Sequence, residues 1–349
     1  MRLRRADRAA HRRATQSPTM AADRIAVFAP SPILTVTIEP GSDRPEVHLH
    51  PGGQGVWVAR MAARLGSEVT LCCALGGEPG RVLSGLLETE PLALRTADAG
   101  TPNGVYVHDR RTGQRVEIAT ADSRALTRHA TDELYGITLA AALDADVTLV
   151  TGTQPHDVVE PDLYRRLASD LRNNRKLVLA DLVGAPLQAI LRGGVDLLKL
   201  SSEELVDEHL AASHELPDIL TGAQQLHSAG ARCVLISRSA NPAILLEDGA
   251  RPRKLELAAP AFEPLDHRGA GDSMFAAIGV GLARGMCAEQ AARLGMAAGA
   301  LNVTRRGLGT GTRQEIERLA KHITIASTNT NDSSRSWRAA QRAGSRRSG

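Results

Sequence analysis

Residues 266–275 read Asp-His-Arg-Gly-Ala-Gly-Asp-Ser-Met-Phe, and this stretch determines how the rest of the chain is interpreted. Gly269 and Gly271 permit backbone conformations that other residues avoid, so several peptide N–H groups can converge where a helix begins. A run rich in small residues follows and predicts that helix over residues 272–284. Free N–H groups and the positive end of the helix dipole make such a start an anion site.

Asp272 lies beside this predicted anion site. A carboxylate next to a bound phosphate can accept the proton of an incoming hydroxyl, and an anion hole with a base is the minimum for phosphoryl transfer to an alcohol. The alternative is structural: Asp272 is a favourable residue for the first turn of a helix, and the glycines form a tight turn. Spacing alone leaves both interpretations open.

The composition is that of a globular protein, with 42% hydrophobic and 23% charged residues among 349. The length allows one large α/β domain or two small ones. The sequence contains no apolar run of the roughly 20 residues that a membrane span needs, so we expect no membrane partner. Aromatic residues are only 2%, which argues against stacking platforms for single-stranded nucleic acid.

The net charge of +3 is set by the two ends of the chain. Residues 1–19 carry +5 and residues 328–349 carry +4, so the remainder carries −6. We expect a disordered basic tail over 1–19, a mostly disordered tail over 318–349, and no nucleic-acid binding by residues 20–317. The four cysteines lack the spacing of metal ligands or of a disulfide framework, which favours a cytoplasmic location.

Two kinds of β pattern divide residues 20–317. Apolar strands alternate with helical segments after residue 130, which predicts a parallel α/β sheet covered on both faces. Residues 33–50 and 103–120 instead contain alternating strands around a hairpin turn at 110–113, which predicts a small β lid. The strands predicted for the main sheet are 24–30, 68–75, 147–150, 177–180, 195–200 and 233–237. The other predicted helices are 56–65, 79–89, 162–172, 186–192, 203–209, 217–228 and 288–304.

The Gly-Ala-Gly-Asp motif at 269–272, which opens a helix of small residues, resembles the signature of the PfkB, or ribokinase-like, carbohydrate kinase family. A second match, Gly52-Gly53-Gln54-Gly55, resembles the family's Gly-Gly-Lys-Gly-x-Asn-x-Ala segment. Residues 196–205 and 297–305 supply two further matches, and all occur in the family's order across about residues 24–315. The nearest branch is the 1-phosphofructokinase and tagatose-6-phosphate kinase group.

The resemblance implies a ribokinase-like, Rossmann-type three-layer α/β domain with a mostly parallel sheet and a β lid that often forms a homodimer. It implies ATP and Mg²⁺ as cofactors and a sugar or sugar phosphate as the acceptor. On the matched motifs, Asp272 would be the base, and the amides of Gly269, Ala270 and Gly271 would form the anion hole. Glu204 would organise Mg²⁺ indirectly, through water. The remaining nucleotide contacts would come from Lys199, Ser201, Ser237, Arg268, Ala298 and Asn302.

The sugar side departs from the family's pattern. The resemblance places the substrate at Thr35, Gly52, Gly53, Gln54 and Trp57. Thr35 stands where the family has Asp, Gln54 where it has Lys, and Trp57 where it has Asn. Each lost charge removes about 1.5–3 kcal/mol of charge-assisted binding. We expect either an altered substrate or weak catalysis, with an inactive nucleotide- or metabolite-binding relative as the alternative.

Several basic side chains keep two interpretations at this stage. Arg268 either neutralises phosphate charge or is solvated. Arg110 and Arg111 either reach a substrate phosphate from the lid or, as the pattern favours, form a solvated hairpin tip. His48 and His50 alternate along one strand, which favours a surface strand over a metal site because no third ligand is evident.

Overall fold

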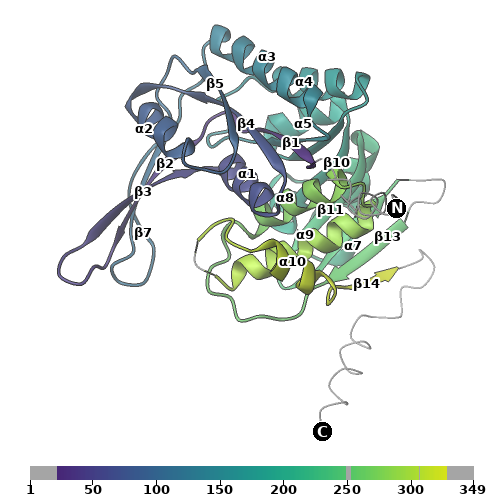
Figure 1. Ribbon diagram of the computed structural model, residues 1–349. Coiled ribbons are helices and arrows are strands. Elements are labelled where there is room, and N and C mark those ends of the chain that lie inside the picture. The colour runs from purple at the N-terminus through teal and green to yellow at the C-terminus, as the bar shows by residue number, and fades with distance from the viewer. Residues whose placement is uncertain (1–21, 249–252, 306, 328–349) are drawn as a thin grey trace, which may run out of the picture.

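One long sheet organises the molecule (Figure 1). The structure is a computed structural model that describes residues 22–248, 253–305 and 307–327. Within these residues the strands of this sheet lie side by side in the order β5 (Ala93–Asp98), β4 (Glu68–Leu75), β1 (Arg24–Phe28), β8 (Val147–Thr151), β9 (Leu177–Asp181), β10 (Val195–Ser201), β11 (Ala231–Arg238), β12 (Asn241–Glu247), β13 (Arg253–Ala258) and β14 (Thr324–Ser327). The strands from β5 to β11 run parallel, and β12, β13 and β14 are antiparallel to their neighbours.

The central strands are buried on both faces, because helices cover the sheet from two sides. Every residue of β8 is buried, and its sequence, Val-Thr-Leu-Val-Thr, contains no charged side chain. One core joins the sheet to α1 (Gln54–Arg64), α8 (Ala270–Ala283), α9 (Ala288–Val303) and α10 (Arg313–Ala320). A second core joins the opposite face to α3 (Arg128–Asp144), α4 (Pro161–Asn173), α5 (Gly184–Gly193), α6 (Ser202–Asp207) and α7 (Leu216–Ala229). The result is the expected three-layer α/β architecture.

Small residues allow α8 and α9 to approach closely. A Cβ on Gly295 would lie 2.6 Å from Ile278, and one on Gly299 would lie 3.0 Å from the carbonyl oxygen of Ala270. Glycine at these two positions therefore allows α9 to pack directly against α8, whose first turn carries Asp272. The composition of these helices therefore fixes the position of the Gly-Ala-Gly-Asp turn.

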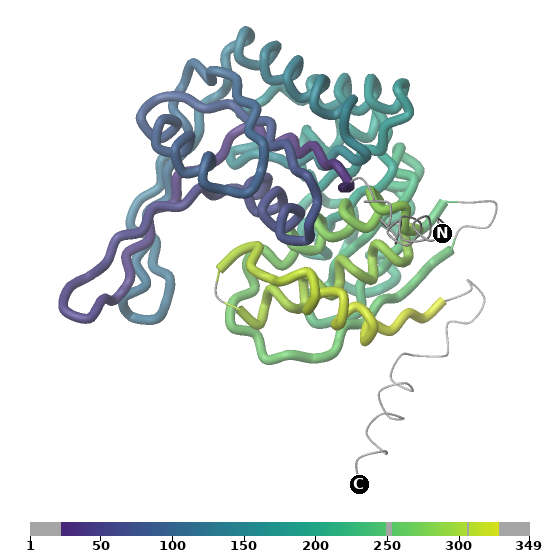
Figure 2. Tube along the Cα trace, viewed as in Figure 1, coloured from purple at the N-terminus to yellow at the C-terminus, as the bar shows by residue number. Residues whose placement is uncertain are grey.

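The lid is a separate four-stranded sheet that extends away from the main body (Figure 2). Its order is β3 (Glu46–Gly52), β2 (Ile33–Glu39), β6 (Val105–Asp109) and β7 (Val116–Ala121), with α2 (Gly77–Leu87) near its base. The register aligns Thr35 and Thr37 of β2 with His50 and His48 of β3, so one face of the lid is polar. The lid was predicted from the alternating pattern, and the turn between β6 and β7 falls at residues 110–113 as expected.

The predicted strands and helices agree with the structure to within two residues at each end. The expected boundary at residue 317 is too early, because it falls inside α10, and β14 then pairs with β13 at the sheet edge. A four-residue strand in a polar segment gives little periodicity, which is why the pattern does not reveal it. The tails 1–19 and 328–349 lie outside the described residues. Among the residues that the structure describes, no helix has the length and hydropathy of a membrane span.

Candidate functional site

The expected site residues meet at the carboxyl ends of the parallel strands. The chain leaves β1 toward β4 on one side and later returns to place β8 on the other side, so the strand order reverses between β1 and β8. Ligands of open α/β sheets bind outside the strand ends at such a reversal. Gln54 begins α1 there, Asp181 and Lys199 lie on β9 and β10, and Asp272 lies in the first turn of α8.

The turn before α8 has the geometry of an anion-binding loop. Gly269 is the N-cap residue and adopts a left-handed conformation, with φ 67° and ψ 6°, that favours glycine. The first helical hydrogen bond runs from the Ser273 N–H to the Gly269 carbonyl oxygen, at 2.9 Å. The amides of Ala270 and Gly271 precede it and have no partner within the helix. They lie at the positive end of the α8 dipole, where an anion is stabilised.

Asn302 holds this turn in place from α9. Its Nδ2 donates to the carbonyl oxygen of Arg268 at 2.7 Å, and its Oδ1 accepts from the Ser273 hydroxyl at 3.1 Å. The side chain is 1% exposed. Asn302 was expected to contact the nucleotide, but both of its polar groups are engaged in anchoring the turn.

A buried ion pair lies beneath the turn. Lys199 Nζ and Asp181 Oδ2 are 2.9 Å apart, and both side chains are almost fully buried. Burial alone would lower the pKa of Lys199, but Asp181 and Glu204 raise it above its ordinary value. A Cβ on Gly271 would lie 2.7 Å from Lys199 Nζ, so the ammonium group lies against the expected anion hole.

Asp181 is the functional candidate that the sequence analysis missed. It is the last residue of β9, one position beyond the predicted strand 177–180. A carboxylate at the carboxyl end of a parallel strand is a signal that could have identified it. Burial raises the pKa of Asp181 to about 6, although Lys199 opposes this shift. The ammonium group of Lys199 thus offsets part of the cost of burying the Asp181 carboxylate.

Asp272 shares this environment. Burial first, and then the nearby charge of Asp181, raise its pKa to about 7, although Lys199 acts in the opposite direction. Glu204 also raises this pKa. A carboxyl group that titrates near neutrality, beside unpaired amides and an ammonium group, is suited to accepting and releasing protons.

Gln54 connects the N-terminal motif to this cluster. Its Oε1 accepts a hydrogen bond from the Gly152 N–H at 3.0 Å, just after β8. Its side chain also hydrogen-bonds to the Asp181 carboxylate, which lowers the pKa of Asp181. The side-chain amide of Gln54 thus connects the carboxyl ends of β8 and β9. A lysine at position 54, as in the family's motif, would place a positive charge there.

The other expected substrate residues line the junction between the lid and α1. Gly53 is the N-cap residue of α1 and has φ 99°. A Cβ on Gly52 would lie 2.5 Å from Thr35 Oγ1, so Gly52 allows β2 and β3 to approach here. Trp57 is half-buried on α1, and its carbonyl oxygen lies close to Gly309. The structure therefore brings Thr35, Gly52 and Gly53 together beside Gln54, and Trp57 lies one turn further along α1.

Ser201 and Glu204 form a capping box at the start of α6. Ser201 Oγ accepts from the Glu204 N–H at 3.1 Å, and Glu204 Oε2 accepts from the Ser201 N–H at 2.7 Å. This arrangement occupies one oxygen of Glu204 and leaves its charge next to Lys199 and Asp272. No group of three or more ligating side chains among the described residues could hold a metal ion alone. The carboxylate oxygens of Glu204 nevertheless suit Mg²⁺ bound mainly through water and phosphate.

Three other expected nucleotide contacts, Ser237 and Ala298 on the adenine side and Arg268 near the phosphates, are less complete. Ser237 of β11 pairs with Ser201 of β10 in the strand register, and its hydroxyl donates to the Leu200 carbonyl oxygen at 3.4 Å. Ala298 is 0% exposed and packs within the core beneath α9. Arg268 is exposed in the loop before the turn. Of these three residues, only Ser237 and Arg268 have surface available to a ligand.

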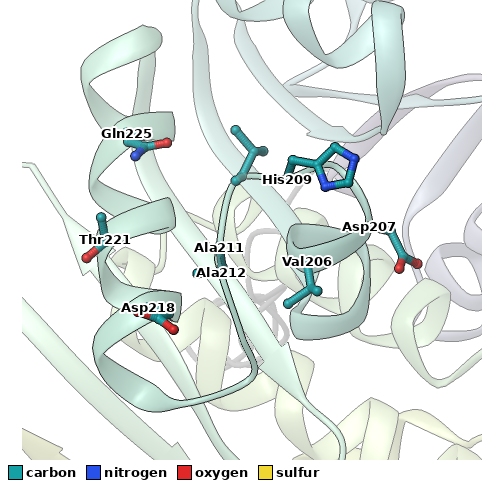
Figure 3. A pocket seen from close by; sticks show the side chains of 9 residues that line it. Val206, Asp207, His209, Ala211, Ala212, Asp218, Thr221 and Gln225 are labelled. Atoms are coloured by element: carbon teal, nitrogen blue, oxygen red, sulfur yellow. The ribbon is translucent and has the colours of Figure 1, made fainter.

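A hollow of about 620 Å³ lies elsewhere, between α6 and α7 (Figure 3). Its lining includes Asp207, His209, Asp218 and Gln225, and none of the expected site residues. Two carboxylates and no Lys or Arg in this lining do not suit the phosphates of a nucleotide. The convergence of polar groups at the strand ends is therefore the better candidate site.

Comparison with known proteins agrees with this geometry. Residues 31–316 match the family described as pfkB family carbohydrate kinase. The ATP-dependent 6-phosphofructokinase isozyme 2 of Mycobacterium tuberculosis is 31% identical, over 85% of this chain and 88% of that protein. A 1-phosphofructokinase of Vibrio cholerae is 26% identical, over 80% of this chain and 86% of that protein.

Solved structures show the same fold. The phosphofructokinase-2 mutant Y23D of Escherichia coli superposes with a TM-score of 0.75 at 24% identity, covering 86% of this chain and 98% of that chain. A ribokinase of Arabidopsis thaliana, solved with ribose and ATP, superposes with a TM-score of 0.67 at 20% identity. The expected ribokinase-like α/β fold is thus confirmed, and the chain belongs to the pfkB family of carbohydrate kinases.

Proposed function

We propose that the chain transfers the γ-phosphoryl group of ATP to a hydroxyl of a sugar or sugar phosphate in the cytoplasm, with Asp272 as the general base. The observation that carries this proposal is the position of Asp272. Its carboxyl group lies one residue beyond the unpaired amides of the Gly269–Gly271 turn, next to Lys199, and titrates near pH 7. A base of this pKa combines the ionised form with useful basicity at neutral pH.

The proposed step is an in-line displacement. Asp272 accepts the proton of the acceptor hydroxyl while the hydroxyl oxygen forms a bond to the γ-phosphorus. The bond from that phosphorus to the β–γ bridging oxygen breaks, and ADP leaves with the electron pair. Asp272 then returns its proton to solvent. ATP and the acceptor alcohol are the only reactants that this step consumes.

Charge stabilisation comes from the elements around the turn. The amides of Gly269, Ala270 and Gly271 face the developing negative charge, and Lys199 supplies a fixed cation beneath them. Glu204 would hold Mg²⁺ through water, with Asp181 nearby as a further carboxylate. A bound Mg²⁺ neutralises charge on the β- and γ-phosphates.

The test compares Asp272 with Asp207, a carboxylate in the lining of the hollow between α6 and α7. ADP release is measured with ATP, Mg²⁺ and a panel of sugars and sugar phosphates, for the unchanged chain, Asp272→Asn and Asp207→Asn. We expect turnover with at least one acceptor, a loss of more than about a hundredfold in Asp272→Asn, and little change in Asp207→Asn. Calorimetry that detects ATP binding while every acceptor fails to release ADP would favour the non-catalytic relative. Loss of turnover only in Asp207→Asn would move the site to the hollow between α6 and α7.

The lid also supports a homodimer. On the face opposite the histidines, the register aligns Val36 and Ile38 of β2 with Leu49 and Val47 of β3. Val47 is 63% exposed and Leu49 45%, and Ile118 on β7 is 56% exposed. An apolar sheet face of this kind is typical of a protein interface. We expect a dimer in light scattering with size exclusion, and Val47→Asp should shift it to monomer; a monomeric unchanged chain would refute this assembly.

A further inference from the structure

Arg60 lies on α1 and connects this helix to two other segments. Its Nε donates to both carboxylate oxygens of Glu90 at 3.1 Å, and its Nη2 lies 2.5 Å from Glu90 Oε1. Its Nη1 faces the carbonyl oxygen of Leu308 at 3.5 Å. Glu90 belongs to the turn that ends α2, where its N–H donates to the carbonyl oxygen of Leu87 at 3.1 Å. Arg60 therefore links α1 to the end of α2 and to the segment 307–311, which precedes α10.

The 307–311 segment lies against α1 at the same place. Gly309 has φ 65°, a left-handed conformation that favours glycine. A Cβ on Gly309 would lie 3.2 Å from the carbonyl oxygen of Trp57 and 3.6 Å from Cδ of Arg60. Glycine at position 309 thus allows the segment to approach the turn of α1 that carries Arg60.

Leu308 connects this segment to the anion-binding turn. A Cβ on Gly269 would lie 2.6 Å from Leu308 Cδ2, and two further atoms of Leu308 would lie 3.5 and 3.6 Å away. The Leu308 side chain therefore packs against Gly269, the N-cap residue of α8. Asn302 anchors the same turn from α9 through its hydrogen bonds. The turn is thus held from two elements, and Arg60 helps to place one of them.

The Arg60–Glu90 pair is better suited to fixing a position than to stabilising the fold. Both side chains are 16% exposed, so each has lost most of its contact with water. The cost of removing two charges from water offsets much of their attraction, and such a pair contributes little net stability. The planar guanidinium nevertheless fixes direction, because it holds both oxygens of Glu90 and faces the Leu308 carbonyl oxygen at the same time.

We infer that Arg60, held by Glu90, is a positioning residue for the anion-binding turn. Through Leu308 it keeps Gly269 and the amides that follow in the orientation that receives the terminal phosphate of ATP. Arg60 does not act on the nucleotide itself, because Glu90 and Leu308 engage all three of its nitrogen atoms. The contact spans a short distance, since α1 packs against α8 (Figure 1). This inference rests on the proposed function and extends its machinery beyond the site.

The test removes this link without leaving a buried charge unpaired. The variant is Arg60→Met with Glu90→Gln, and the matched control is Arg284→Met with Asp23→Asn. Arg284 and Asp23 form a similar pair, 3.3 Å apart and 15% and 14% exposed, and Arg284 also donates to a carbonyl oxygen, that of Leu65. Arg284 is the C-cap residue of α8, so the control pair lies about 20 Å from the turn, at the other end of the helix.

Hydrogen–deuterium exchange of the amides in residues 267–275 reports on the turn independently of activity. We expect the Arg60/Glu90 variant to accelerate this exchange at least about fivefold, and the Arg284/Asp23 variant to leave it within about twofold. Calorimetry should show that a non-hydrolysable ATP analogue binds about tenfold more weakly to the Arg60/Glu90 variant alone, and kcat/KM for ATP should fall by at least that factor. Thermal melts establish that each variant folds.

Unchanged exchange of residues 267–275 in the Arg60/Glu90 variant, or undiminished affinity for the analogue, would overturn the inference. If this variant does not fold, Leu308→Ala provides the same measurements, because it removes the contact with Gly269 and leaves the ion pair in place. ADP release distinguishes the two proposals. Turnover and exchange that do not depend on Arg60 remove the positioning role alone, whereas Arg60-dependent exchange and analogue binding in a chain without turnover remove the kinase activity alone.

Discussion

Replacement of Asp272 by Asn should stabilise the folded chain at neutral pH while it abolishes phosphoryl transfer. The carboxyl group ionises at a pKa of about 7 in the folded chain, chiefly because of burial and then because of Asp181. In the unfolded chain it ionises near its ordinary value of 3.8. Between these two values the folded state retains a proton that the unfolded state has released, so its stability falls as the pH rises from about 4 to 7 and is constant above.

The magnitude follows from the difference between the two pKa values. A shift from 3.8 to about 7 corresponds to about 4 kcal/mol as an upper limit, at 1.36 kcal/mol for each pKa unit. Asn has the shape of the protonated carboxyl and does not ionise. The free energy of unfolding of Asp272→Asn should therefore equal that of the unchanged chain near pH 4 and exceed it by up to that limit above pH 7.

Urea unfolding at half-unit intervals from pH 4.5 to 8.5 measures this difference directly. Asp43→Asn, at an exposed lid position, is the control and should change stability by no more than about 0.5 kcal/mol at any pH. ADP release is followed on the same preparations. The reasoning would be refuted if the difference in unfolding free energy between Asp272→Asn and the unchanged chain does not grow with pH, or if Asp272→Asn is the less stable of the two at pH 8. Either result would show that burial does not raise the pKa of Asp272.

Three further predictions concern the same site. The ratio kcat/KM should rise about tenfold per pH unit below pH 7 and level off above it, because Asp272 must be ionised to act as the base. Measurement of ADP release across pH 5.5–8.5 checks this profile, and a flat profile would contradict the prediction. Lys199→Met should lower the free energy of unfolding by about 3–5 kcal/mol in urea, since it leaves Asp181 buried without its cation; an unchanged midpoint would show that the pair is not buried in solution. Gly269→Ala should lower the free energy of unfolding by about 1–2 kcal/mol, because the φ of 67° at Gly269 disfavours a side chain and a Cβ would lie 2.6 Å from Leu308. The substitution should also raise the KM for ATP, and normal ATP kinetics would argue against the turn as the anion hole.

Local patterns predicted most of the fold. Mainly apolar runs predicted β8, β9 and β10, and a run of small residues predicted α8. These predictions succeeded because a strand buried on both faces needs apolar residues and a tightly packed helix needs small ones. The alternating segments marked the lid, whose two faces meet different surroundings. The antiparallel strands β12, β13 and β14 at one end of the sheet were not predicted, since the formation of such strands depends on their partners as much as on their own residues.

The site was predicted in part. Asp272 and its turn were identified because a glycine-rich helix start and its adjacent carboxylate are contiguous in the chain. Asp181 was missed, because a single Asp after a buried strand has no distinctive neighbours in the sequence. The hydrogen bonds to Arg268 and Ser273 reveal that Asn302 anchors the turn, and its contact with the nucleotide stays a prediction.

The sequence by itself determined short-range features: most central strands of the main sheet, most of the helices that cover it, the glycine turn and the acid that follows it, whereas β5, α3, β12, β13, α10 and β14 were not predicted. Tertiary structure alone decided which distant residues became neighbours. Gln54, Asp181, Lys199 and Asp272 converge because parallel strands present their carboxyl ends on one edge of the sheet. Arg110 meets Asp266 across 156 residues of chain because the lid folds toward the loop before α8. Such contacts depend on the packing of whole elements, and no local pattern in the sequence encodes them.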